Sequence, residues 1–166
     1  SFVGCCCTLG LRIESPVDDT AAADDEAPAR PVADSLDPDP ILPEPLRGYL
    51  GGDVCSLDWQ RLGLGAYQCL IPTHDEETTA RLLRIPAGRP VPTHSHGGLE
   101  LTLVLSGAFS DTTGTYGRGD LQEADEYLDH QPHAAAGEDC ICLAVTDAPL
   151  RFKSLAARMV QPLIGI

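Results

Sequence analysis

Three side chains that could hold a metal ion lie close together in the sequence. His94, His96 and Glu100 are two and four residues apart. Side chains of an extended strand alternate between its two faces, so even spacing allows all three to point to one side. Two imidazoles and a carboxylate there make most of a transition-metal site. A second stretch, from Gly119 to His130, can supply a further imidazole.

The donor types restrict the metal. Three neutral imidazoles and one carboxylate suit zinc first, and Fe, Mn or Ni as well, whereas Mg and Ca prefer oxygen ligands throughout. We therefore expect one divalent metal ion held by His94, His96 and Glu100, with a further ligand such as His130 from the second stretch. His133 is an alternative to His130 if the turn before it is irregular. Four protein ligands can close a tetrahedron or leave positions open on an octahedral metal, and the sequence leaves both possible.

The elements that must position these side chains are short strands. From Leu46 onward, apolar runs alternate with Gly, Pro and Asp turn signals, which indicates an antiparallel sandwich or barrel over residues 46–166. A short helix or turn at Leu46–Leu50 ends at Gly51, and Lys153–Val160 forms a short C-terminal helix or tail. The expected strands are Leu57–Arg61, Ala66–Ile71, Thr78–Ile85, Leu99–Leu105, Ala108–Ser110, Gly114–Tyr116, Leu121–Ala124, Asp139–Thr146 and Leu150–Phe152.

Residues 1–45 have a different composition. They contain a Cys5–Cys7 run and then a Pro-, Ala- and Asp-rich stretch in which Arg30 is the one base among ten acids from Glu14 to Pro45. We interpret them as an N-terminal remnant and an acidic linker. The net charge of −14 argues against nucleic-acid binding. Apolar runs are too short for a membrane span and no convincing signal peptide is present, which predicts a cytoplasmic protein.

The metal-binding stretch resembles the first motif of the cupin superfamily. Gly88, His94, His96, Glu100 and Gly107 fill every position of that motif. The second motif resembles Gly119 to His130, with its first Gly and its His in register. Its Pro, second Gly and final Asn are replaced here by Asp125, Tyr127 and Ala134. The resemblance implies an all-β, antiparallel double-stranded β-helix, the cupin or jelly-roll barrel.

Residues from about 46 to 166 further resemble the C-terminal domain of ChrR-type anti-sigma factors. Such proteins hold an extracytoplasmic-function sigma factor inactive and release it under singlet-oxygen or organic-peroxide stress, and their cupin domain binds its own zinc. The resemblance implies His94, His96, Glu100 and His130 as the zinc ligands. It is carried by DWQR at 58–61, ARLL at 80–83, GLELTLVL at 98–105, YGRGD at 116–120, DCICL at 139–143 and DAPLRF at 147–152.

One family feature does not occur in this sequence. The sigma factor is bound through a helical module with a His-X3-Cys-X2-Cys motif, which is absent here. The resemblance therefore implies a regulatory sensor domain with a sigma factor as partner through a module outside these residues. A homodimer is also compatible. The alternative is a metal-dependent dioxygenase or isomerase, although Arg118 is the nearest cation that could anchor a substrate.

Cys140 and Cys142 also match the family. Their spacing puts both thiols on one strand face. They are interpreted either as small buried residues or as an oxidant-sensing thiol pair close to the metal. A strained disulfide between them is a further possibility. The odd total of seven Cys favours reduced thiols over a disulfide framework.

Overall fold

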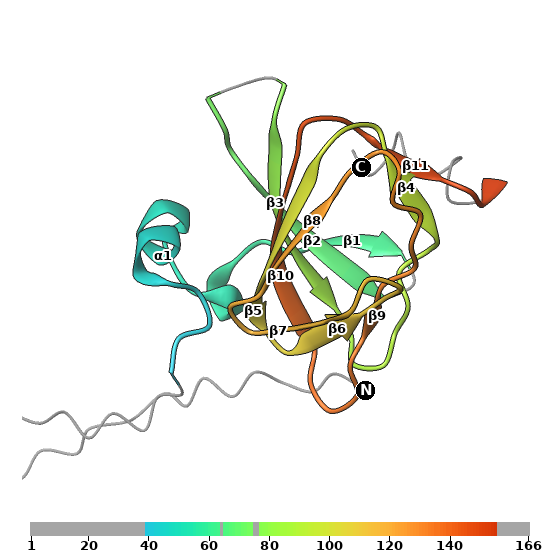
Figure 1. The fold of residues 1–166 in the computed structure, drawn as a ribbon. Coiled ribbons are helices and arrows are strands. Elements are labelled where there is room, and N and C mark those ends of the chain that lie inside the picture. Colours follow the sequence, from blue (N-terminus) through green and yellow to red (C-terminus); the bar gives the residue numbers. More distant parts are fainter. Residues whose placement is uncertain (1–38, 64, 75–76, 156–166) are drawn as a thin grey trace, which may run out of the picture. The chain divides into compact units, whose positions relative to one another are not determined.

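The computed structural model describes residues 39–63, 65–74 and 77–155. The chain divides into two units at Asp39, and the unit from Pro40 onward contains all the elements below. Strands curl around a common interior in an antiparallel barrel (Figure 1), which confirms the expected all-β cupin fold. The Cys5–Cys7 run and most of the acidic linker lie outside the described residues. The predicted tail Lys153–Val160 also lies mostly outside them.

The larger sheet has six strands. It contains β1 (Gln60–Gly63), β2 (Ala66–Ile71), β3 (Thr79–Ile85), β5 (Glu100–Ser106), β8 (Leu121–Ala124) and β10 (Cys140–Thr146). Their spatial order is β1-β2-β3-β10-β5-β8, and every neighbouring pair is antiparallel. The central strands β3, β5 and β10 are rich in Leu, Ile and Val, which suit a pleated surface buried on both faces.

Two smaller sheets form the opposite wall. One has the order β7-β6-β9, formed by β7 (Thr115–Gly117), β6 (Ala108–Ser110) and β9 (His133–Ala134). The other pairs β4 (His94–His96) with β11 (Leu150–Phe152). Isolated bridges pair Pro90 with His133 of β9, and His94 of β4 with His130. These bridges place the segment with His130 directly beside β4.

The interior between the walls has an apolar part and a polar part. Ile85, Val104 and Cys140 of the larger sheet pack against Phe109 and Ala134 of the β7-β6-β9 sheet. Towards β4 the buried residues become polar. They are Gln68, Arg81, His94, His96, Thr102, Gln122, His130 and Thr146. Buried polar groups cost stability unless they find partners, so this end of the barrel is where a function is expected.

The outer face of the larger sheet is covered by the segment that precedes it. Helix α1 (Glu44–Leu50) and the 3-10 turn η1 (Val54–Ser56) lie over Leu82, Leu105 and Ile141. Leu42, which is 1% exposed, inserts among these side chains. The Asp53 carboxylate fixes its backbone by accepting the N–H groups of Ile41 and Leu42 at 3.0 Å each.

Most of the expected elements are confirmed. The helix ends at Gly51, whose φ of 77° closes it in the left-handed conformation. The strand expected at Leu57–Arg61 is wrong in its first half, because Leu57 and Trp59 leave the sheet to pack on its outer face. β4 and β9 are too short for a periodic pattern and were not among the expected strands. In the described part of the chain, no helix is long and apolar enough to cross a membrane.

Candidate metal centre

The first stretch of potential ligands is divided between two strands, although its even spacing would also have allowed a single one. His94 and His96 lie on β4, whereas Glu100 begins β5 after a bend at Gly97 and Gly98. The bend needs glycine, because a Cβ at Gly97 would lie 2.7 Å from the Pro149 carbonyl oxygen. A Cβ at Gly98 would overlap a carboxylate oxygen of Asp147. The sharing of one face by His94 and His96 is nevertheless as predicted, and both are buried.

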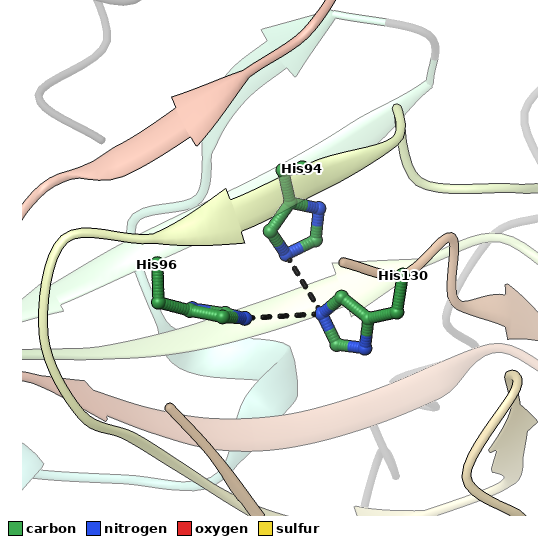
Figure 2. Close-up of side chains that lie close together, drawn as sticks. All are labelled: His94, His96 and His130. Carbon is green, nitrogen blue, oxygen red and sulfur yellow. Dashed lines mark hydrogen bonds between the residues drawn. The ribbon is translucent and has the colours of Figure 1, made fainter. Parts of the chain in front are cut away.

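Three imidazoles converge inside the barrel. Figure 2 shows the rings of His94 and His96 reaching from β4 towards His130 on the neighbouring segment. The Nε2 atom of His130 lies 3.1 Å from Nε2 of His94 and 3.2 Å from Nε2 of His96. All three residues are at most 3% exposed. Within the described residues they form a group whose ligand atoms lie within 4.8 Å of one another.

Two of these rings are oriented by acceptors on their other nitrogen. Nδ1 of His94 lies 2.8 Å from the Pro92 carbonyl oxygen, and Nδ1 of His130 lies 2.6 Å from a carboxylate oxygen of Asp111. A carbonyl and a carboxylate can only accept, so both Nδ1 atoms carry the proton. In the neutral imidazole the lone pair is then on Nε2. Both lone pairs are directed to the centre of the group.

The geometry and charge of the group fit a cation. Burial lowers the pKa of His94 to about 4, and burial together with the two neighbouring histidines lowers that of His96 to about 4, so both are neutral near pH 7. Facing lone pairs repel unless a proton or a metal ion lies between them, and one proton cannot serve three nitrogens. Tetrahedral zinc with Zn–N bonds of about 2.0–2.1 Å separates its ligand nitrogens by roughly 3.3 Å, close to the spacing here.

Glu100 lies next to this group without joining it. Its Oε2 atom is 3.8 Å from Nδ1 of His96, and its Oε1 atom accepts a hydrogen bond from Thr102 at 3.1 Å. Burial raises the pKa of Glu100, despite the opposing hydrogen bond from Thr102 and the positive charge of Arg81. Nδ1 of His96 is buried and has no hydrogen-bond partner among the described residues. A carboxylate at this position therefore has two uses, as a ligand after rotation or as an acceptor for His96.

Asp111 is the site residue that the sequence did not indicate. It follows β6 in a turn rich in Thr and Gly, and its side chain accepts the backbone N–H of Thr113, as Asp does in many turns. The sequence therefore offers an ordinary structural explanation for it. In the structure the other carboxylate oxygen contacts His130. Burial opposes its ionisation, but hydrogen bonds from Thr113, Gln122 and His130 outweigh burial and lower the pKa of Asp111 well below its usual value.

The interior also contains a cation that the sequence did not place there. Arg81 on β3 is 6% exposed and donates to Oε1 of Gln68 at 2.9 Å. Its charge acts on Glu100. Arg118, the cation expected nearest to the site, instead directs its guanidinium to the Pro40 carbonyl oxygen at 3.4 Å. The strand register explains why Arg81 points inward, because Arg81 pairs with Ala144, which in turn pairs with the inward residue Thr102.

Cys140 and Cys142 are both buried and reduced on the inner face of β10. Cys140 belongs to the apolar core beside Val104 and Phe109. A hydrogen bond between the two thiols, reinforced by burial, raises the pKa of Cys142, and the same bond lowers that of Cys140. The charge of Glu100 contributes to the raised pKa of Cys142, so this thiol interacts electrostatically with a residue at the metal-binding end of the barrel.

The other candidate histidine lies outside the group. His133 on β9 is exposed and its Nδ1 lies 2.9 Å from the Gln131 carbonyl oxygen. The structure thus brings His94, His96 and His130 together, places Glu100 beside His96, and leaves His133 on the surface.

The sequence matches the ChrR Cupin-like domain family over residues 50–149. It is 52% identical over 128 residues to the Anti-sigma-E factor ChrR of Cereibacter sphaeroides. That alignment covers 77% of this chain and 60% of the relative, so the chain spans less than two thirds of the relative's length.

Two solved structures also match this chain. The crystal structure of Rhodobacter sphaeroides SigE in complex with the anti-sigma ChrR matches with a TM-score of 0.62 and 52% identity, covering 68% of this chain and 61% of that one. An RmlC-like cupin protein from Ralstonia eutropha matches with a TM-score of 0.54 and 19% identity, covering 63% of this chain and 71% of that one. The second likeness concerns the fold alone.

Proposed function

Because the chain belongs to the ChrR cupin-like domain family, we propose that it is the metal-binding sensor domain of an anti-sigma factor. Its metal is zinc, held by His94, His96 and His130, with Glu100 as the fourth ligand. Its role is to regulate transcription in response to singlet oxygen or an organic peroxide. The convergence of three buried Nε2 atoms supports the metal site most directly.

Glu100 differs from the three histidines of that ligand set, because its Oε2 atom lies near Nδ1 of His96 and its Oε1 atom accepts a hydrogen bond from Thr102. A rotation that breaks the Thr102 hydrogen bond would bring it into the coordination sphere. Glu100→Gln separates the two uses, since an amide oxygen is a poor zinc ligand but still accepts a hydrogen bond. If Glu100 is a ligand, the visible spectrum of the cobalt-substituted protein changes in this variant. An unchanged spectrum would assign Glu100 to His96 instead.

Metal binding can be tested on the purified chain. We expect one zinc per chain by elemental analysis in the wild type and less than one tenth of that in His94→Ala. His133→Ala is the matched control, because it removes an exposed imidazole three residues from His130 and should retain full zinc. Loss of zinc from the control, or retention in His94→Ala, would contradict the assignment.

Sensing is proposed to involve the metal end of the barrel and the thiols of Cys140 and Cys142. The support is their burial on the inner face and the charge coupling of Cys142 to Glu100. Singlet oxygen or an organic hydroperoxide should release zinc or oxidise these thiols, as measured by a zinc-responsive dye and by mass spectrometry. If neither zinc content nor thiol mass changes at oxidant doses that modify exposed Cys55, the sensing role fails.

The partner is proposed to be an extracytoplasmic-function sigma factor, and the protein is proposed to act in the cytoplasm. The support is the similarity to an anti-sigma factor and to a structure described as SigE in complex with ChrR. The His-X3-Cys-X2-Cys motif is absent from these residues, so we assign sensing to them and the sigma-factor contact to another module. Titration of the chain with SigE should accordingly give no tight complex, and a submicromolar dissociation constant would refute this division.

A further inference from the structure

The Asp111 carboxylate is buried in a way that turn formation alone does not explain. Its side chain has 0% of its surface exposed, and its Oδ2 atom lies 2.6 Å from Nδ1 of His130. Removing a charged group from water is costly unless it is fully paired. An Asp that served only the turn at Thr113 could keep its second oxygen in solvent.

Within the described residues, each hydrogen-bond partner of this carboxylate is a donor. Oδ1 accepts the backbone N–H of Thr113 at 2.7 Å and its hydroxyl at 2.6 Å. Oδ2 accepts Nε2–H of Gln122 at 2.8 Å and Nδ1–H of His130. Such surroundings suit an ionised carboxylate and oppose an amide, whose NH2 group would face donors.

The fold holds the carboxylate firmly in this place. The pairing of Ser110 with His133 brings the chain after β6 beside the segment that contains His130. The Thr113 hydroxyl lies 2.9 Å from the Tyr116 hydroxyl, and the Tyr116 ring stacks on Phe109 with centroids 5.1 Å apart. Asp111 is therefore anchored to the core as well as to the imidazole.

We propose that Asp111 is a positioning residue of the metal centre that acts through His130. It keeps the proton of His130 on Nδ1 and turns the ring so that the Nε2 lone pair faces His94 and His96. The negative charge of the carboxylate that accepts the Nδ1–H also makes Nε2 of His130 a stronger electron-pair donor to a metal. His94 obtains its orientation from the neutral Pro92 carbonyl instead, so among the three imidazoles His130 has the hydrogen-bonded carboxylate.

This inference rests on the proposed metal site, and its first test is made without metal. In the metal-free protein at pH 8, long-range proton–nitrogen NMR spectra of the histidine rings should show His130 as the Nδ1–H tautomer, with that proton shifted downfield. In Asp111→Asn the downfield signal should disappear. His130 in the Nε2–H tautomer in the wild type would overturn the proposal even if zinc binds.

The second test measures zinc affinity by competition with a chelator. Asp111→Asn should bind zinc about 10- to 100-fold more weakly than the wild type. Asp120→Asn is the matched control, because Asp120 also accepts a backbone N–H in a turn, that of Gly117 at 2.8 Å, and is not hydrogen-bonded to any histidine of the described residues. Its affinity should stay within twofold of the wild type.

A double-variant cycle separates positioning from general loosening of the fold. In a His130→Ala background, Asp111→Asn should weaken zinc binding less than twofold, since its effect passes through the missing ring. The same loss in both backgrounds would show a purely structural role and overturn the proposal. If the wild type bound no zinc, the proposed function would fail, and the tautomer measurement would still decide the role of Asp111.

Discussion

Along β5 and β10, alternate residues enter two different environments. Leu103, Leu105, Ile141 and Leu143 face outward and pack with Leu42 under the segment that precedes the barrel. The inward residues on the same strands include Thr102, Cys142 and the start of the site at Glu100. Both faces of the sheet carry buried residues, but those of the outer face are apolar and those of the inner face near β4 are polar.

This difference indicates that the two faces of one sheet have separate roles, one in stability and one in metal binding. Burial of apolar surface contributes to stability at about 25 cal/mol per Å² and needs no ligand. Buried imidazoles and carboxylates cost stability until they are paired or bind a cation. We therefore expect the outer face to set the stability of the metal-free domain and the inner face to set metal affinity.

The largest effect should come from the inner face. His96→Ala removes one of three converging imidazoles and should weaken zinc binding by more than about 100-fold, because loss of a direct ligand exceeds the 10- to 100-fold effect of supporting residues. Isothermal titration with zinc and a competing chelator measures this. The free energy of unfolding of the metal-free variant should equal that of the wild type, because the outer face sets stability. Zinc affinity equal to that of the wild type would contradict the assignment of metal binding to the inner face.

A substitution on the outer face should lower stability without changing zinc affinity. Leu42→Ala should lower the free energy of unfolding of the metal-free domain by about 2–5 kcal/mol, because Leu42 is buried among Leu82, Leu105 and Ile141. Chemical denaturation measures the loss, with Leu70→Ala as a control on a side chain that is 46% exposed. Zinc affinity of the folded fraction should not change. A tenfold loss of affinity would show that the two faces are coupled.

Acid should affect the metal-free inner face at moderate pH. The folded pKa of His94 and of His96 is about 4, below the unfolded value near 6.5, so the unfolded chain binds more protons between these values. Stability is thus full above about pH 6.5 and lost as the pH falls towards 4, by at least about 5 °C in melting temperature. The raised pKa of Glu100 opposes this trend, so the measurement is best repeated in Glu100→Gln. A melting temperature that is flat from pH 7 to pH 5 in that variant would contradict the expectation.

The smallest effect concerns the carboxylate that fixes the covering segment. Asp53→Asn weakens the acceptor for the N–H groups of Ile41 and Leu42 and should cost about 1 kcal/mol. Despite partial burial, hydrogen bonds from Leu42, Val54 and Ile41 lower the folded pKa of Asp53, so its contribution is present above about pH 4 and lost below it. Thermal melts at pH 7 and pH 3 should show a difference between wild type and variant at pH 7. An equal difference at both values would assign the effect to packing.

The fold and the convergence of three of the four candidate ligands were predictable because their signals are local. Motif spacing identified His94, His96 and His130, and the glycines and short apolar runs identified a β-barrel. The break between β4 and β5 was not predictable, since it depends on the close approach of Pro149 and Asp147, some fifty residues later. Asp111 and Arg81 were missed for the same reason. Their roles come from strand register and from contacts between distant segments, which leave no spacing in the sequence.

The central claim is that the three imidazoles form one metal centre, and X-ray absorption at the zinc edge tests it most directly. The account predicts a first shell of nitrogen and oxygen at about 2.0–2.1 Å, with the outer-shell scattering of three imidazole rings. One imidazole should be lost in His130→Ala. Sulfur at about 2.3 Å would assign the metal to cysteines and contradict the account, as would a spectrum that is unchanged by His130→Ala.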